Sequence, residues 1–267
     1  MILKGKKGLI TGVANQRSIA WGIAKSCWEQ GAELCFSVPG ERLRGSVEGL
    51  IKGEGKDAPI YDCDVTNDQS VVDLFEKVKA EVGEIDFLVH AIAFAKREDL
   101  DGEFQDTSRE GFNLAMDISA YSLTALAHHA TAAMSEGGAI VALSYIGGEV
   151  VIPHYNMMGV AKAALECSVR YLAHDLGRAK KIRVNTVSSG AIRTLAAKGI
   201  GDFNKMLSIS ADRSPLGRGV DTSEVGDAVA FLVSDMGRGI TGELIHVDAG
   251  YHCVSFSTQD LGEEPKA

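Results

Sequence analysis

Short apolar runs alternate with helical patterns along nearly the whole chain, and this alternation constrains the fold more than any other feature of the sequence. The helical patterns cover residues 18–27, 69–82, 111–134, 156–176 and 224–234. The apolar runs predict strands at residues 8–11, 32–37, 58–63, 85–91, 139–143, 182–188 and 244–248. Strands separated by helices must pair in parallel through right-handed crossovers, so the alternation predicts an α/β fold.

No shift in composition, internal repeat or low-complexity insert interrupts this alternation. A chain of 267 residues is long enough for one large α/β domain. We therefore expect a single Rossmann-type, doubly wound domain over residues 1–255, with about seven parallel strands flanked by helices. A polar tail follows at residues 256–267. Ser18 is the expected N-cap of the first helix, and Thr222 or Ser223 that of the helix at 224–234.

The composition argues against several classes of partner. A net charge of −9 and an isoelectric point near 5.3 disfavour nucleic acid and anionic membranes, which select basic surfaces. The N-terminus lacks the apolar core of a signal peptide, and no apolar run approaches membrane length. Five cysteines show no metal-binding spacing, which favours reduced, buried thiols and no metal site. We expect a soluble, cytoplasmic protein.

Small and polar residues gather where five of the expected strands end. These segments are residues 12–18, 64–65, 91–93, 144–145 and 189–192. Ligands of open α/β sheets bind beyond the carboxyl ends of the strands, so the pattern predicts a nucleotide site there. In the first segment only Gly12 matches the usual glycine fingerprint, and an ordinary strand–helix connection would look similar. The helix start at Ser18 nevertheless provides the backbone donors that bind phosphate.

Two tyrosines and a lysine lie between residues 144 and 162. If Tyr155 and Lys162 share a helix, the seven residue steps from one to the other advance about 700°, roughly 20° short of two turns. Both side chains then face one side, separated by a rise of about 10.5 Å. A phenol so placed can meet a substrate while the ammonium meets a bound sugar. Tyr145 ends the preceding strand and is aimed at the same crevice, although a packing role remains the alternative for each tyrosine.

Together these segments resemble the short-chain dehydrogenase/reductase superfamily over residues 1–255, with four departures from its common pattern. Gly159 stands four residues after Tyr155, where that pattern has its lysine, and Tyr145 replaces the usual serine. The segment 90–93 reads His-Ala-Ile-Ala instead of Asn-Asn-Ala-Gly, and the loop after the first strand is longer than usual.

All four departures match one branch of the superfamily, the enoyl-acyl-carrier-protein reductases of bacterial fatty-acid synthesis. That branch looks like Gly-Val-Ala-(x)3-Ser-Ile-Ala, Asp-Val, Ser-Tyr-x9-Tyr-x6-Lys and Ile-Arg-Thr-Leu-Ala. This chain has the four motifs at residues 12–20, 64–65, 144–162 and 192–196. Two small differences remain in other segments: Ala191 stands where proline is common, and Ala93 where glycine often occurs.

The resemblance implies reduction of the trans-2 double bond of enoyl-acyl-carrier-protein thioesters by a reduced nicotinamide, the last reductive step of fatty-acid elongation. It makes Tyr155 the hydrogen-bond donor to the thioester oxygen and Lys162 the ligand of the nicotinamide ribose. Tyr145 shapes the acyl pocket or assists, and Ala95 borders the substrate. It assigns the cofactor to Gly12, Ser18, Ile19, Asp64, Val65, Ile92, Lys162, Ile192, Arg193, Thr194, Leu195 and Ala196.

The residues after the second strand bear on the choice between NADH and NADPH. They lack the acidic residue that usually binds the ribose 2′-hydroxyl. Arg42 or Arg44 could meet a 2′-phosphate, or both could belong to a solvated helix start, while Glu41 would repel the phosphate. We expect NADH, with NADPH as the alternative.

Two other functions fit the same fold. A carbonyl reductase or alcohol dehydrogenase would act on ketones and not on enoyl thioesters, and a non-catalytic sensor would only report the dinucleotide ratio. The resemblance also implies an acyl carrier protein as partner and a homotetramer. Small residues on two long helices would suit an interface between copies. They are Ala115, Ala120, Ala125, Ala161, Ala163 and Ala164.

The segment 194–206 is expected to cover the substrate. Its apolar residues are interspersed with Gly199 and Gly201, which weaken a helix. We predict that its amide hydrogens exchange rapidly in the free protein and slowly once cofactor and substrate bind. Hydrogen-exchange mass spectrometry checks this, and equally slow exchange in both states would contradict it.

Overall fold

The computed structural model describes residues 1–194 and 203–256. In this part of the chain a sheet of seven strands has the order β3-β2-β1-β4-β5-β6-β7, and every neighbouring pair is parallel. The strands are β1 (Lys7–Thr11), β2 (Glu33–Val38), β3 (Ile60–Asp62), β4 (Ile85–His90), β5 (Met134–Tyr145), β6 (Arg183–Ser189) and β7 (Leu244–Val247). All seven expected strands and the doubly wound α/β fold are confirmed.

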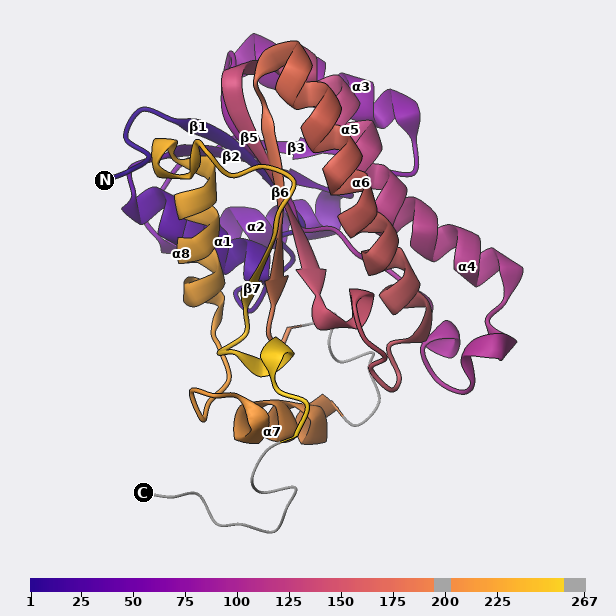
Figure 1. The fold of residues 1–267 in the computed structure, drawn as a ribbon. Coiled ribbons are helices and arrows are strands. Elements are labelled where there is room, and N and C mark those ends of the chain that lie inside the picture. The colour runs from indigo at the N-terminus through magenta and orange to yellow at the C-terminus, as the bar shows by residue number, and fades with distance from the viewer. Residues whose placement is uncertain (195–202, 257–267) are drawn as a thin grey trace.

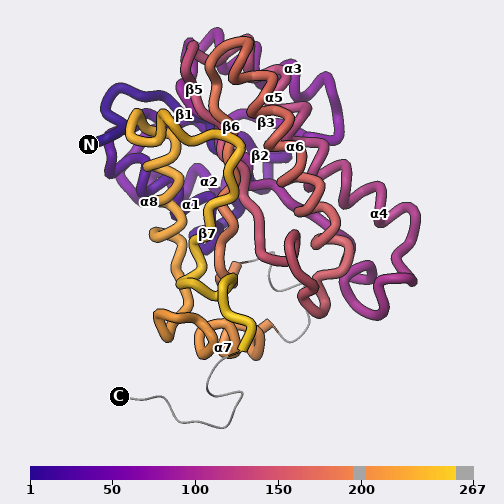
Figure 2. The backbone as a smooth tube through the Cα atoms, viewed as in Figure 1, coloured from indigo at the N-terminus to yellow at the C-terminus, as the bar shows by residue number. Residues whose placement is uncertain are grey.

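Helices cover both faces of the sheet (Figure 1). One face carries α1 (Ile19–Glu29), α2 (Glu41–Gly53) and α8 (Thr222–Val233), and the other carries α3 (Asp68–Glu81), α5 (Ser122–Ala133) and α6 (Asn156–Lys180). The expected helix at 111–134 is two helices, α4 (Arg109–Met116) and α5, joined by the π-helical turn Asp117–Tyr121. Figure 2 shows α7 (Phe203–Arg213) beyond the ends of β6 and β7. No helix of the described residues is both long and apolar enough to cross a membrane.

Two apolar layers hold these helices to the sheet. Successive strand residues point to opposite faces, so Ile10 enters the layer under α1 while Leu9 enters the layer under α3. Val89 and Leu88 divide in the same way on β4. Because both faces of these strands are buried, each strand is a continuous apolar run in the sequence.

Two expectations about small side chains are corrected. Cys167 and Cys253 are exposed, whereas the other three cysteines are buried as expected. Of the six alanines expected at an interface between copies, Ala163 is exposed and Ala164 is half-buried. The other four pack inside the chain itself: Ala115, Ala120, Ala125 and Ala161.

Helices α1 and α8 approach one another closely through two glycines. A Cβ atom on Gly22 would lie 2.4 Å from Thr222 Cβ, and one on Gly226 would lie 2.8 Å from the Gly22 carbonyl oxygen. The cap of α8 is Asp221, not Thr222 or Ser223 as expected from the sequence. Its carboxylate accepts the N–H groups of Ser223 (2.8 Å) and Glu224 (3.2 Å), because the helix already begins at Thr222.

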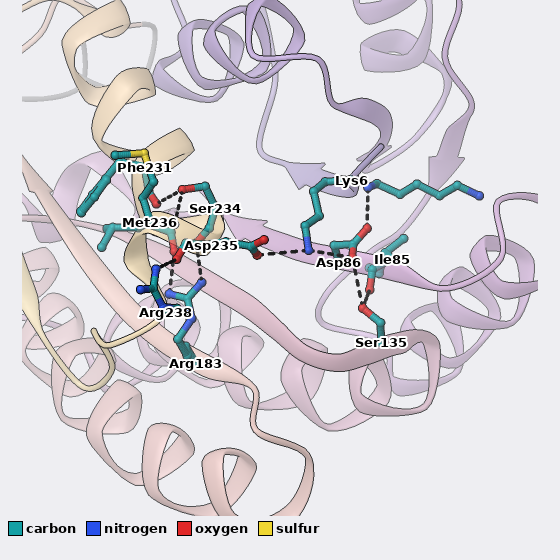
Figure 3. A network of polar contacts seen from close by, with 12 residues as sticks. Lys6, Ile85, Asp86, Ser135, Arg183, Phe231, Ser234, Asp235, Met236 and Arg238 are labelled. Carbon is teal, nitrogen blue, oxygen red and sulfur yellow. Dashed lines mark hydrogen bonds and ion pairs between the residues drawn. The ribbon is translucent and has the colours of Figure 1, made fainter. Parts of the chain in front are cut away.

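A polar network joins the amino ends of the strands (Figure 3). Lys6 Nζ lies 3.6 Å from Asp86 Oδ1 on β4 and 3.4 Å from Asp235 Oδ1 beyond α8. Arg183, the first residue of β6, donates to the carbonyl oxygen of Ser234 at 3.2 Å. These contacts tie β1, β4, β6 and α8 together at the edge opposite the carboxyl ends of the strands.

We predict that Gly22→Ala lowers the free energy of unfolding by about 1–3 kcal/mol, because the added methyl group forces α1 and α8 apart. Gly49→Ala is the matched control, since Gly49 lies within α2 and a Cβ atom there meets nothing within 4 Å. The control should stabilise the protein by up to about 1 kcal/mol through lower chain entropy in the unfolded state. Urea unfolding followed by circular dichroism measures both values, and equal effects would contradict the packing account.

Candidate active site

Tyr155 and Tyr145 meet at the carboxyl end of β5. Tyr155 is the residue before α6, and its ring lies 5.0 Å from that of Tyr145, centroid to centroid, at an interplanar angle of 71°. Gly147 makes room for this arrangement, because a Cβ atom there would lie 2.4 Å from Tyr155 Cδ1. Ala95 packs against the same cluster, so three residues expected at a substrate site lie together.

The hydroxyl groups of both tyrosines are available to a ligand. Neither has a hydrogen-bond partner among the described residues. Burial raises the pKa of Tyr155, and the neighbouring Tyr145 and Glu166 raise it further. Burial also raises the pKa of Tyr145 to about 12. Both phenols are therefore neutral donors at physiological pH.

Gly159 explains why the lysine does not follow Tyr155 by four residues. A Cβ atom on Gly159 would lie 2.7 Å from the carbonyl oxygen of Gly147, in the 3₁₀ turn Ile146–Gly148. This position of α6 is in close contact with that turn and has no room for a side chain. The lysine comes one helical turn later, at a position that faces the end of β5.

Lys162 is buried, and its ammonium donates to the carbonyl oxygen of Leu143 at 2.7 Å. Burial lowers the pKa of Lys162 to about 8, although the carboxylate of Glu166 opposes this shift. An ammonium has three N–H donors, and Leu143 is its only hydrogen-bond partner among the described residues. The remaining donors suit hydroxyl groups such as those of a ribose.

Glu166 is a functional candidate that the sequence reasoning missed. It is buried one turn after Lys162 on α6 and accepts a hydrogen bond from the Ser144 hydroxyl. Burial raises the pKa of the Glu166 carboxyl. A glutamate four residues after a lysine on one helix face was the available signal.

His90, at the end of β4, is a second missed residue. Its Nε2 lies 2.8 Å from Ser122 Oγ, and the hydroxyl of Ser122 donates to the carbonyl oxygen of Ile118 at 2.6 Å. Nε2 must therefore carry the proton, which leaves Nδ1 as a buried acceptor with no partner among the described residues. Burial and the charge of Lys162 lower the pKa of His90 to about 3, so the imidazole is neutral.

The loop after β1 has the features of a phosphate cradle. Gly12 has φ +83°, and a Cβ atom there would lie 2.0 Å from the carbonyl oxygen of Ala91, so only glycine fits. Ser18 stands at the N-cap position but does not cap α1 as expected. Its hydroxyl accepts the N–H groups of Ala14 and Asn15, both at 3.1 Å, and thereby shapes the loop.

The first turn of α1 keeps free backbone donors. Within the described part of the chain no group accepts the N–H groups of Ile19 and Ala20. These donors lie at the positive end of the helix dipole. The loop and the helix start therefore fit the pyrophosphate of a dinucleotide.

The other expected cofactor residues lie along the same edge. Asp64 Oδ1 accepts the N–H (3.0 Å) and hydroxyl (2.7 Å) of Thr66, so this carboxylate shapes a turn. Val65 and Ile92 pack against the layer under α3, and Ile192 packs against the layer under α1. Arg193 is exposed and Thr194 is half-buried. Leu195 and Ala196 lie outside the described residues.

Comparison with known proteins points to one family. The family model for Enoyl-(Acyl carrier protein) reductase matches residues 12–252. An NADH-dependent enoyl-[acyl-carrier-protein] reductase of Bacillus cereus is 56% identical over 94% of this chain and 98% of that protein. An NADPH-dependent one of Staphylococcus aureus is 51% identical, with 94% of this chain and 98% of that protein covered.

Solved structures agree with this match. A Bacillus cereus enoyl-acyl carrier protein reductase with NADP+ and indole naphthyridinone superposes with a TM-score of 0.93 at 55% identity. The match covers 96% of this chain and 99% of that one. The corresponding Anaplasma phagocytophilum enzyme in complex with NAD has a TM-score of 0.92 at 47% identity, over 96% of this chain and 97% of that one.

We predict that Glu166→Gln moves the pKa of Lys162 below its value of about 8, because the nearby negative charge that favours the ammonium is lost. The fraction of charged Lys162 then falls at a lower pH than in the wild type. Glu29→Gln, which removes an exposed carboxylate on α1 that acts on neither Lys162 nor Glu166, is the control and leaves the midpoint unchanged. An NMR titration of ¹³Cε-labelled lysine, assigned with Lys162→Met, measures both. Equal Lys162 midpoints in the two variants would contradict the effect of the Glu166 charge on Lys162.

Proposed function

We propose a role for each residue of this site from the premise that the chain belongs to the enoyl-[acyl-carrier-protein] reductase family. The protein is an oxidoreductase of fatty-acid synthesis. It reduces the trans-2 double bond of enoyl-acyl-carrier-protein thioesters, with NADH as the favoured cofactor and NADPH as the alternative.

The dinucleotide fits the crevice at the carboxyl ends of the strands. The N–H groups that begin α1 would bind its pyrophosphate beside Gly12. Lys162 would bind the nicotinamide ribose, and Asp64 Oδ2, which accepts no hydrogen bond from the described residues, is free for the adenine. When bound, NADH supplies the hydride that reduces the β-carbon of the substrate.

Tyr155 stabilises the charge that this reduction creates. Negative charge develops on the thioester oxygen as an enolate forms, and a donor aimed at that oxygen binds it more strongly in the transition state. The observation that carries the proposal is the Tyr155 hydroxyl itself, which is neutral and has no partner among the described residues. Its ring is held by Gly147 and Tyr145, so the donor is preorganised.

Lys162 contributes through its charge and its remaining donors. Its ammonium is held by Leu143 while it binds ribose hydroxyls, so it orients the cofactor. Its positive charge in a buried setting also favours negative charge on the nearby enolate. Tyr145 packs on Tyr155 and mainly shapes the acyl pocket.

One assay tests the function most directly. Loss of reduced-nicotinamide absorbance is followed with crotonyl and longer trans-2-enoyl thioesters, with NADH and NADPH in parallel. The expected result is turnover of enoyl thioesters and preference for NADH. Reduction of ketones without activity on enoyl thioesters would support the carbonyl-reductase alternative instead.

We predict that Tyr155→Phe lowers kcat on the order of 10²-fold with little change in NADH affinity, as for loss of an oxyanion donor.

Lys162→Ala should instead weaken NADH binding, since ribose contacts are made in the ground state. Lys162→Arg should not restore binding, because a planar fork replaces a compact ammonium. Tyr145→Phe should be the mildest change. Steady-state kinetics gives kcat for each variant, and fluorescence titration gives its NADH affinity. A large loss of kcat in Tyr145→Phe together with near-normal kcat in Tyr155→Phe would reverse the roles of the two tyrosines.

We further propose that residues 1–255 work as one dinucleotide-binding and catalytic domain, with 194–206 covering the substrate and 256–267 as a tail. The chemistry of the substrate supports an acyl carrier protein as partner. The acidic composition and this metabolic role support a cytoplasmic location.

We also propose a homotetramer, with α5 and α6 at an interface between copies. Tyr121 is 55% exposed at the start of α5 and Tyr171 on α6 is 72% exposed, and apolar rings on a surface favour association. Light scattering should give about 114 kDa, four times the chain mass of 28.4 kDa. Tyr171→Glu should reduce that mass. A wild-type mass of 28.4 kDa at micromolar concentration would contradict the proposal.

A further inference from the structure

The relatives of this chain include both NADH-dependent and NADPH-dependent reductases at similar identity. The two cofactors differ only in the phosphate on the 2′-oxygen of the adenosine ribose. In sheets of this kind the ribose meets the end of the second strand, where an acidic residue favours the hydroxyl and an arginine accommodates the phosphate. The residues around the end of β2 therefore decide which cofactor this chain prefers.

The first turns of α2 lie beside the loop after β1, which we expect to bind the pyrophosphate. Ser37 of β2 pairs with Thr11 at the end of β1, directly before Gly12. On α2, the Ser46 hydroxyl donates to the carbonyl oxygen of Ala14 at 3.1 Å, which ties the helix to the loop. The start of α2 therefore lies near the end of β2, where the adenosine ribose is expected.

The guanidinium of Arg44 already makes two hydrogen bonds, whereas its Nε has no hydrogen-bond partner among the described residues. Its Nη1 donates to the carbonyl oxygen of Ile60 at 2.6 Å, and its Nη2 donates to Asp62 Oδ2 at 2.8 Å. Its Nε lies 3.7 Å from Glu41 Oε1. Asp62 is the last residue of β3 and lies opposite Val38, the last residue of β2. The bond between Arg44 and Asp62 therefore lies at the carboxyl ends of these two strands.

We propose that Asp62 sets the NADH preference of this chain by holding Arg44 away from a 2′-phosphate. The proposal rests on the function above, because it assumes that a nicotinamide dinucleotide binds in this crevice. A guanidinium fork binds phosphate with two parallel hydrogen bonds, and Arg44 uses that fork on Asp62 and Ile60.

The carboxylates also repel the phosphate. The side chains of Asp62 and Glu41 are 48% and 86% exposed, so their charges face the solvent from which the cofactor arrives. A 2′-phosphate adds nearly two negative charges beside them, whereas a 2′-hydroxyl adds none. The same two carboxylates therefore lower the affinity for NADPH and leave NADH binding unaffected.

Titration calorimetry on the full chain tests this with NADH and NADPH. Asp62→Asn keeps the size of the side chain and removes its charge, so NADPH should bind about tenfold more tightly while NADH changes by less than about twofold. The gain should shrink at high salt. Asp57→Asn removes the same charge from the loop before β3, at the other end of that strand, and should change neither affinity.

Two further variants test whether the gain depends on Arg44, since Arg42 is exposed at the start of α2. Arg44→Gln in the Asp62→Asn background should remove most of the gain and leave only the part that comes from lost repulsion by Asp62. Arg44→Gln alone should weaken NADPH binding by no more than about threefold, because Arg44 makes no contact with the phosphate and only offsets the charges of Asp62 and Glu41. The single variant Arg44→Gln also keeps the proposal testable if Asp62→Asn does not fold.

Three results would overturn the proposal: equal wild-type affinity for the two cofactors, equal gains in Asp62→Asn and Asp57→Asn, or a loss of NADPH affinity well beyond about threefold in Arg44→Gln alone. Each can occur while wild-type protein reduces enoyl thioesters with NADH, which would leave the proposed function standing. A wild-type protein that binds neither dinucleotide would overturn both.

Discussion

The buried ammonium of Lys162 is the constraint on which the site depends. A charge removed from water destabilises the fold unless nearby dipoles and counter-charges compensate it. Here the Leu143 carbonyl accepts one hydrogen bond from it, and Glu166, itself bonded to Ser144, provides a negative charge one helical turn away. These contacts fix α6 against the end of β5. The position of Tyr155 at the start of that helix follows from them.

Close backbone approach is the second requirement, and glycines supply it. Gly147 leaves room for the ring of Tyr155, and Gly159 lets α6 pass the turn that holds Gly147. Gly12 plays the same part where the end of β1 meets β4. The longer spacing from Tyr155 to Lys162 is thus the spacing that this packing permits.

Much of this could be predicted because it depends on local pattern. Strands buried on both faces are apolar runs. The sequence also predicted that Tyr155 and Lys162 lie close together, and both lie near the end of β5, although Tyr155 precedes α6 instead of belonging to it. The wrong or missing predictions concern the hydrogen-bond partners of individual side chains. Ser18 bonds back into its loop instead of capping α1, because Ala14 and Asn15 come within reach only after the loop folds. The bond of Ser144 to Glu166 joins residues far apart in the sequence and depends on the packing of α6 on β5, which no local pattern encodes.

In the mechanism that we propose, the Tyr155 hydroxyl donates a hydrogen bond to the thioester oxygen. Isotope-edited Raman difference spectroscopy with a ¹³C-carbonyl enoyl thioester, bound together with NAD⁺, measures this bond without turnover. A hydrogen bond polarises the carbonyl and lowers its stretching frequency. We expect a lowered frequency in the wild type and in Tyr145→Phe, and a return toward the solution value in Tyr155→Phe. A frequency unaffected by Tyr155→Phe, or restored by Tyr145→Phe, would contradict this mechanism.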